Sequence, residues 1–215
     1  PTSDVVLTIT SDDTGEATLN SPLTFTSANW DTPQTVTVTG VDDGFVDGTI
    51  TSTITVAVDD ANSDDDFDSV ADQTVSVDTL DDDVAGFTIE ETDGSTEVDE
   101  SGSTDTFTVV LDAQPTSDVV LTITSESTTE ASVNPSSVTF TSENWDTPQT
   151  VTVTGVDENV VDGDQTTNIT IAILDTASDD NFDDLADQTV SVDTLDDDVA
   201  GFTIEETDAA TEVDE

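Results

Sequence analysis

The chain has 215 residues, and its 39 aspartates and 13 glutamates are accompanied by no lysine, arginine or histidine, so the formal net charge is −52 at pH 7. Cysteine and tyrosine are absent as well. This composition excludes Ser-His and Cys-His nucleophiles, zinc sites built on thiolate or imidazole, disulfides, and the basic surfaces that neutralise nucleic-acid phosphates. The sequence also contains no run of about 18 apolar residues. We therefore expect no enzyme activity, no nucleic-acid partner and no membrane insertion of this segment.

The uncompensated charge predicts a requirement for cations. Like charges oppose a compact state, and the chain has no basic side chain to offset them. Carboxylate oxygens select hard cations, of which Ca²⁺ is the common extracellular example. Aspartate outnumbers glutamate three to one, which fits loop ligands better than a general adaptation to salt. We predict that Ca²⁺ is part of the folded structure.

The sequence repeats with a period of about 115 residues, the size of one β-sandwich domain. The longest recurring stretches are 1–10 with 115–124, 29–40 with 144–155, and 71–87 with 186–202. We predict a partial repeat without its first strands at 1–83, a complete repeat at 84–198, and the start of a third at 199–215. The partial repeat would expose half a core, so either a longer parent chain or a strand from another chain completes it.

Within the complete repeat the apolar pattern has a period of two. In residues 107–111, 119–123, 151–154 and 169–173, large apolar residues alternate mainly with threonine, which is typical of strands with one face on a core. The predicted strands are 84–90, 104–112, 118–125, 136–141, 149–155, 166–174 and 188–194. With polar connections between them, they predict an all-β fold of tandem seven-stranded antiparallel, Ig-like β-sandwiches.

Alternating strand directions would gather the acidic loops at the two ends of each sandwich. The loops after the first, third and fifth strands share one end with the residues that follow the last strand. The carboxylates at that end are Glu100, Glu130, Asp157, Glu158, Asp162, Asp164, Asp196, Asp197 and Asp198. The opposite end gathers Asp118, Glu143, Asp146 and the acidic residues of 179–184. In a tandem array the two ends would meet at a domain junction and repel each other unless cations lay between them.

Several motifs resemble the Calx-β domain family, in the bacterial branch found as tandem repeats in large surface adhesins. They are Glu100-Ser-Gly102, the strand end at 151–158, the Leu-Asp-Asp-Asp-Val-Ala-Gly-Phe stretch of 195–202, and the Trp-containing stretches 25–40 and 140–155. The resemblance covers essentially the whole chain and implies a seven-stranded sandwich with Ca²⁺ bound in the loops at one end. By position it implies the ligands Glu100, Glu130, Asp157, Glu158, Asp196, Asp197 and Asp198 in the complete repeat. In the partial repeat it implies Glu16, Asp42, Asp43, Asp81, Asp82 and Asp83, while Asp47, Asp162 and Asp164 match the family's loop more loosely.

These observations predict a mechanical role, as calcium-stabilised extender repeats of a large secreted or cell-surface bacterial protein. The repeats would act as a rigid spacer in an adhesin or a surface filament, with neighbouring repeats and other copies as partners. Two rival hypotheses remain open at this stage. An exposed aromatic row or a continued threonine plane would favour a carbohydrate- or ice-binding module, and a pocket with two carboxylates about 5–9 Å apart would favour a domain of a halophilic secreted enzyme.

Two further features allow alternative interpretations. The acidic runs 64–66 and 179–180 fit a solvated face and a metal-binding loop equally well. Trp30 and Trp145 lie in loops before a strand, where we expect them to cover one end of the core rather than to stack on sugars.

Overall fold

The computed structural model describes residues 1–205 and divides into two compact units, Pro1–Ala85 (unit 1) and Gly86–Glu215 (unit 2, described to residue 205). Every regular element in the described part is a β-strand or a single 3₁₀ turn, which confirms the prediction of an all-β fold. None of the helical turns of residues 1–205 has the length and apolar character needed to cross a membrane.

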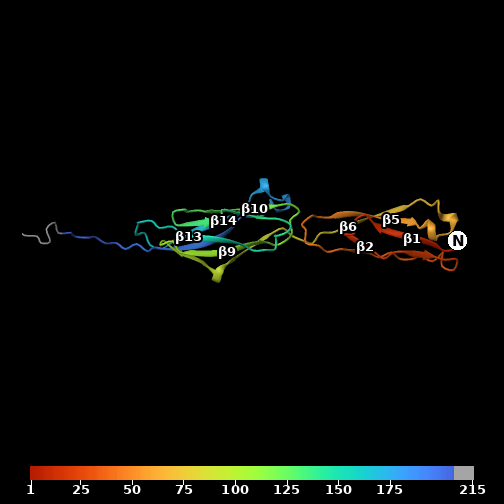
Figure 1. Cartoon of the computed structure of the whole chain (residues 1–215), viewed down its shortest axis with the longest axis horizontal. Helices are drawn as coiled ribbons and strands as arrows, with labels where there is room; N and C mark the ends of the chain where they lie inside the picture. Colours follow the sequence, from red (N-terminus) through yellow and green to blue (C-terminus); the bar gives the residue numbers. More distant parts are fainter. Residues whose placement is uncertain (206–215) are drawn as a thin grey trace, which may run out of the picture. The chain divides into compact units, whose positions relative to one another are not determined.

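Unit 1 contains six strands and two 3₁₀ turns. They are β1 (Val5–Ser11), β2 (Ala17–Leu19), β3 (Leu23–Phe25), β4 (Val38–Gly40), β5 (Ile50–Val58), η1 (Asp60–Asn62), η2 (Asp65–Phe67) and β6 (Gln73–Thr79). One sheet has the order β3-β1-β5-β6 and the other contains only β2 and β4. Figure 1 shows β1, β5 and β6 of the larger sheet side by side.

The described part of unit 2, residues 86–205, contains nine strands in two sheets. They are β7 (Phe87–Glu91), β8 (Thr96–Asp99), β9 (Thr104–Leu111), β10 (Val119–Ser125), β11 (Ala131–Asn134), β12 (Ser137–Phe140), β13 (Gln149–Gly155), β14 (Gln165–Ile173) and β15 (Gln188–Leu195). The 3₁₀ turns are η3 (Thr92–Gly94), η4 (Asp175–Ala177) and η5 (Asp180–Phe182). The sheet orders are β12-β10-β14-β15-β8 and β11-β13-β9-β7. Each of the seven strand ranges predicted from the sequence overlaps one of these strands.

The prediction of seven strands, all antiparallel, is wrong in two places. The first place is β8, which lies in a stretch predicted as a loop after the first strand; the turn Thr92–Gly94, where Asp93 has φ 57° and Gly94 φ 84°, leads the chain from β7 to the other sheet. There β8 pairs in parallel with β15. The second place is β11, which pairs with β13 but has too few apolar residues to be recognised from its pattern.

The core of unit 2 follows from the alternation of apolar residues with threonine. Phe107 and Val109 on β9 and Val151 and Val153 on β13 are fully buried. The threonines between them are partly or fully exposed, as Thr152 illustrates. Strands with this pattern bury one face only, so two sheets packed face to face enclose a single core.

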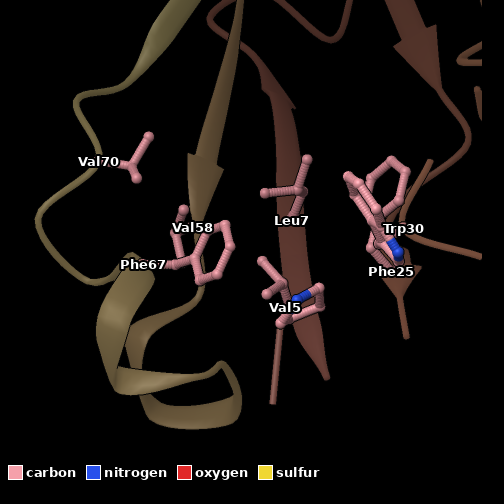
Figure 2. A pocket seen from close by; sticks show the side chains of 8 residues that line it. Val5, Leu7, Phe25, Trp30, Val58, Phe67 and Val70 are labelled. Atoms are coloured by element: carbon pink, nitrogen blue, oxygen red, sulfur yellow. The ribbon is translucent and has the colours of Figure 1, made fainter. Parts of the chain in front are cut away.

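Unit 1 shares several strand sequences with unit 2 but has a more open core. Figure 2 shows an apolar groove of about 280 Å³ in this unit, lined in part by side chains of β1, β3 and β5. Strands β6 and β15 share the sequence QTVSVDT, yet Val75 on β6 is 56% exposed while Val190 on β15 is 2% exposed. Val38 and Val153 differ in the same way, at 37% and 0%. The difference arises because residues 1–85 contain no strands equivalent to β7, β8 and β9.

Candidate metal centres

The most unusual side chain of the molecule is Glu100, at the end of β8. Its backbone N–H donates to the Leu195 carbonyl over 3.1 Å, which fixes the residue beside the end of β15. The side chain is 0% exposed, and neither carboxylate oxygen has a hydrogen-bond partner among the described residues. A buried charge without a partner is strongly unfavourable, so this carboxyl group is either protonated or balanced by a cation.

Local sequence holds the chain around Glu100 in place. The Asp99 carboxylate accepts hydrogen bonds from the backbone and hydroxyl of Ser101, and the Asp99 N–H donates to the Ser103 hydroxyl over 2.7 Å. Gly102 completes the turn at φ 92°, a conformation that favours glycine. The turn therefore presents Glu100 inward while its neighbours satisfy the backbone.

A second glycine brings another acidic loop against this turn. A Cβ atom at Gly155, the last residue of β13, would lie only 2.0 Å from the Asp99 carbonyl oxygen. Only glycine therefore allows β13 to end directly against β8. The loop that follows β13 carries Glu158 and Asp162 to the buried carboxylate.

Two groups of carboxylates form at this end of unit 2, and Glu100 belongs to both. Glu100 joins Asp196 and Asp198 in one group, and Glu158 and Asp162 in the other; in each group one oxygen per residue lies within 4.8 Å of the others. Asp196 also organises the site, because its carboxylate accepts the N–H of Gly163 over 2.7 Å and that of Asp198 over 2.8 Å. Asp196 therefore links the acidic triplet 196–198 to the loop after β13.

The carboxylates of these two groups raise one another's pKa values. Burial raises the pKa of Glu100 above its ordinary value, and the charges of Asp196 and Glu158 raise it further. Burial, followed by the charges of neighbouring carboxylates, also raises the pKa of Glu158 and of Asp198. A bound cation would remove this penalty by favouring the ionised form.

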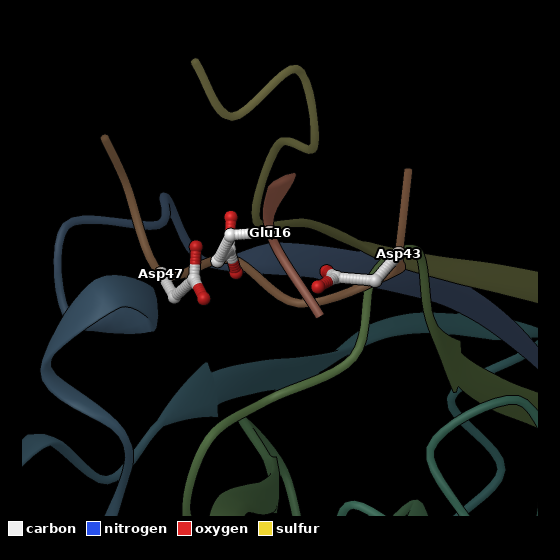
Figure 3. A group of neighbouring side chains, drawn as sticks. All are labelled: Glu16, Asp43 and Asp47. Carbon is white, nitrogen blue, oxygen red and sulfur yellow. The ribbon is translucent and has the colours of Figure 1, made fainter. Parts of the chain in front are cut away.

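Unit 1 contains a corresponding acidic cluster. Glu16, Asp43 and Asp47 form one group within 4.8 Å, and Asp42, Asp82 and Asp83 form another. Figure 3 shows the carboxylates of Glu16, Asp43 and Asp47 pointing toward one another. Burial raises the pKa of Glu16, of Asp47 and of Asp83, and nearby carboxylates raise each further.

Asp81 of unit 1 corresponds to Asp196 of unit 2 and makes similar hydrogen bonds. Its carboxylate accepts the backbone N–H groups of Gly48 (2.8 Å), Asp83 (2.8 Å) and Asp47 (3.1 Å). These hydrogen bonds, that from Gly48 first, lower the pKa of Asp81. The residue therefore shapes the loop that carries the other carboxylates.

The structure brings together most of the residues that the sequence analysis assigned to calcium. Those outside the four compact groups are Glu130, Asp157, Asp164, Asp197 and Asp81. Besides Asp81, described above, two of them contribute to the surroundings of the groups. Glu130 has one buried carboxylate oxygen without a hydrogen-bond partner, and the Asp164 carboxylate accepts the Asp196 N–H over 3.2 Å.

In the opposite acidic runs Asp65, Asp66 and Asp180 are exposed, as in a solvated face, but the first aspartate of each run has a role that was not considered from the sequence. Asp64 and Asp179 are 5% and 4% exposed and cap the 3₁₀ turns η2 and η5. The Asp179 carboxylate accepts the N–H and hydroxyl of Thr116, each over 2.7 Å, and the Ser117 N–H over 2.9 Å. Hydrogen bonds lower the pKa of both aspartates. They are structural caps that tie each run to the chain before β1 or β10.

The contributions of Asp99, Asp64 and Asp179 were not predicted from the sequence. Asp99 could have been found from its Asp-x-Ser spacing, because an aspartate readily accepts the N–H two residues later. The caps carry a similar signal, since Asp64 and Asp179 also accept the N–H two residues on. Their contacts with Thr2 and Thr116 join residues more than 60 positions apart, which no local pattern reveals.

The donor set fits a hard divalent cation. All side-chain ligands at these sites are carboxylate oxygens, which suit Ca²⁺, Mg²⁺ or Mn²⁺ rather than zinc or copper. Ligands on opposite sides of one Ca²⁺ ion are about 5 Å apart, because each lies at roughly 2.3–2.6 Å from the ion. Groups within 4.8 Å can therefore close on a calcium ion with little movement.

Comparison with known proteins gives a distant structural similarity. No protein-family model and no curated protein matches the chain. Domains 4 and 5 of the S-layer protein SbsC match with 20% identity and a TM-score of 0.42, over 88% of this chain and 70% of that one. The E. coli chaperone DraB matches with 10% identity and a TM-score of 0.38, over 55% and 59% of the two chains. SSP-19, an MSP-domain-like protein of Caenorhabditis elegans, matches with 15% identity and a TM-score of 0.32, over 47% and 92%.

Proposed function

We propose that the chain is a calcium-dependent structural module, in which Ca²⁺ completes the end of each β-sandwich unit. The observation that carries the proposal is Glu100, a fully buried carboxylate without a hydrogen-bond partner in the described residues, in a chain without lysine, arginine or histidine. Its charge can be balanced only from outside the side chains of the protein. Four more carboxylates, those of Asp196, Asp198, Glu158 and Asp162, lie within reach of the same ion or pair of ions.

Calcium is the cation that we assign to these sites. Ca²⁺ accepts six to eight oxygen ligands in flexible geometry, whereas Mg²⁺ demands near-ideal octahedral geometry and gives up its water reluctantly. The ligands here lie on loops from several strand ends, and Glu158 and Asp162 come from one such loop. We expect dissociation constants of roughly 10⁻⁴–10⁻³ M, as in extracellular calcium modules.

We further propose that the units are Calx-β-like extender repeats of a large bacterial surface or secreted protein. The recurring sequences of the strands and of the acidic triplets at Asp81 and Asp196 support this proposal. Each triplet follows the last strand of its repeat, and the first lies just before the boundary between the units at Ala85. Bound calcium would stabilise each sandwich and restrict the chain that leaves it, which suits a spacer outside the cell, where calcium is abundant.

Calorimetric titration of the metal-free chain tests this assignment. We expect Ca²⁺ to bind at more than one site per unit with sub-millimolar to millimolar affinity, and Mg²⁺ to bind more weakly. Scattering profiles in Ca²⁺ and in EDTA then test the spacer role, because calcium should extend and stiffen the chain. Absence of calcium binding would overturn the metal assignment, and unchanged scattering in a chain that binds calcium would overturn the spacer role.

A further inference from the structure

The chain contains four Asp-Gly pairs, and the aspartates of three of them belong to the carboxylate groups. The pairs are 43–44, 47–48, 93–94 and 162–163. Asp43, Asp47 and Asp162 each lie in a group whose oxygens are within 4.8 Å of one another. Asp93 lies in the turn between β7 and β8 and is in none of the groups formed by residues 1–205. An aspartate followed by glycine therefore recurs where we propose that calcium binds.

An aspartate before a glycine can modify its own backbone. The glycine nitrogen attacks the side-chain carboxyl carbon and closes a succinimide ring, while one carboxyl oxygen leaves as water with the amide proton and a proton from solvent. Water then opens the ring at either carbonyl. Opening at the backbone carbonyl gives isoaspartate, in which the main chain runs through the former side-chain carboxyl. Glycine favours ring closure because it has no Cβ to shield its nitrogen and its backbone bends freely.

Two of the pairs, both in unit 2, have nearly the same local conformation. Gly163 has φ 79° and Gly94 has φ 84°, and a Cβ atom at either position would meet nothing within 4 Å. Asp162 and Asp93 are both exposed. Backbone shape and access therefore predict similar rates of ring closure at the two pairs. A difference between their rates must come from the other groups that hold the reacting atoms.

At Asp162 both reacting atoms are engaged by the carboxylate groups. The Gly163 N–H donates to the Asp196 carboxylate over 2.7 Å, so the nitrogen that would attack is held by a different carboxylate. The Asp162 carboxylate itself shares a group with Glu100 and Glu158. A calcium ion in that group would hold its oxygen ligands at about 2.3–2.6 Å. The Asp162 side chain could then not turn toward the Gly163 nitrogen without leaving the ion.

Unit 1 repeats this arrangement at Asp47-Gly48. Gly48 has φ 76° and donates its N–H to the Asp81 carboxylate over 2.8 Å. The Asp47 carboxylate points toward those of Glu16 and Asp43 (Figure 3). The two units differ in the residues just before this pair, yet both place a glycine directly after an aspartate of the group.

We infer that Asp162-Gly163 is a site of covalent self-modification, and that bound calcium suppresses the reaction; the inference rests on the proposed calcium function. Loss of calcium frees the Asp162 carboxylate to turn, and isoaspartate forms. The product adds one carbon to the main chain of the loop and attaches the carboxylate directly to Cα. This carboxylate no longer reaches the position that Asp162 has beside Glu158. A period without calcium therefore causes a permanent loss of affinity at this end of unit 2.

Incubation of the full chain at neutral pH, in EDTA and in CaCl₂ at equal ionic strength, tests the inference. Protein isoaspartate methyltransferase measures the total isoaspartate. Cleavage after glutamate places the two pairs on peptides 92–97 and 159–205, and electron-transfer fragmentation locates the modified residue. We expect isoaspartate at Asp93 and at Asp162 in EDTA. At free calcium about 100 times the dissociation constant the metal-free state is about 100 times rarer, so the rate at Asp162 should fall about 100-fold, with no change at Asp93.

Two variants separate binding of the ion from other effects of calcium. Glu100→Gln removes a ligand of the same group and leaves both Asp-Gly pairs intact. A loss of affinity of about 100-fold would leave about half of the sites empty at this calcium concentration, so isoaspartate would form at Asp162 about 50 times faster than in the unmodified chain. Glu97→Gln, at an exposed position of the same strand, is the matched control and should keep the protection. The rate at Asp93 in each variant reports whether the chain is folded.

A chain that binds calcium in the calorimetric titration, yet forms isoaspartate at Asp162 equally fast in both buffers, would overturn the inference and leave the proposed function intact. Equal slowing at Asp93 and Asp162 would also overturn it, because calcium would then act only by keeping the chain folded. No isoaspartate at Asp162 in EDTA would have the same consequence. Absence of calcium binding would overturn the proposed function together with the inference.

Discussion

The change in melting temperature caused by Glu100→Gln should have opposite signs in calcium and in EDTA. Glutamine keeps the size of the side chain and removes its charge. In EDTA the variant should melt at a higher temperature than the unmodified chain, because a buried carboxylate without a partner is lost. In calcium it should melt at a lower temperature, because Glu100 belongs to both carboxylate groups of unit 2.

The expected size follows from the number of groups. At a free calcium concentration about 100 times the dissociation constant, one occupied site stabilises the folded state by about 2.7 kcal/mol. Two sites in unit 2 then contribute about 5 kcal/mol, or roughly 20 °C at about 4 °C per kcal/mol. A 100-fold loss of affinity at each site would leave about 0.4 kcal/mol per site, so most of the calcium-induced rise should disappear.

The chain offers a suitable reporter and a matched control. It contains two tryptophans, Trp30 in unit 1 and Trp145 in unit 2, so a Trp30→Phe background lets Trp145 fluorescence follow the melting of unit 2. Glu97→Gln makes the same change on the same strand, at an exposed position. It should behave as the unmodified chain. An equal loss of stability for Glu100→Gln in calcium and in EDTA would mean that Glu100 acts through packing, and would refute the reasoning.

Three other predictions concern pH, the buried caps and proteolysis. In EDTA the melting temperature should be higher at pH 5 than at pH 7. The pKa of Glu100 is raised in the folded state, so the folded state holds this proton more tightly than the unfolded state and loses stability as the pH rises above about 4.5. Calcium should reverse the order of the two melting temperatures, and the same pH dependence in both buffers would contradict the prediction. Asp179→Ala should lower the free energy of unfolding by about 2–3 kcal/mol with or without calcium, because several N–H and O–H donors lose their acceptor. Chemical denaturation measures this loss, with Asp180→Ala at the exposed neighbouring position as the control. Equal losses for the two variants would contradict the capping role of Asp179. Trypsin should not cleave the chain even in EDTA, because the chain contains no lysine or arginine. Proteinase K should cleave the chain faster in EDTA than in calcium. Equal survival in the two buffers under proteinase K would show that calcium does not protect the chain from proteolysis.

The strands were predictable because their pattern is strong and local. The alternation of valine or isoleucine with threonine located β9, β13 and β14 within one or two residues. The departure of β8 to the other sheet was not predictable, because it depends on the conformation of a short turn in which Asp93 has φ 57° and Gly94 φ 84°. The partner of β8, β15, is about 95 residues away, and no periodicity encodes a parallel pairing at that distance.

It was predictable which loops form the candidate site, but not how their side chains are arranged and buried. Strand direction placed Glu100, Glu158 and Asp196 at one end of unit 2, and the structure has their oxygens within 4.8 Å in shared groups. The complete burial of Glu100 could not be read from the sequence, since it depends on the contact of Gly155 with the Asp99 backbone. The same is true of Asp179, which looks like part of an exposed acidic run and is a buried cap.

Thermal unfolding of the metal-free chain, followed by far-UV circular dichroism in EDTA, in MgCl₂ and in CaCl₂, tests the central claim most directly. If calcium completes the sandwich ends, CaCl₂ should raise the melting temperature by ten degrees or more at about 100 times the dissociation constant, with a smaller rise in MgCl₂ at equal ionic strength. The same melting temperature in EDTA and in CaCl₂ would contradict the claim that calcium holds this chain together.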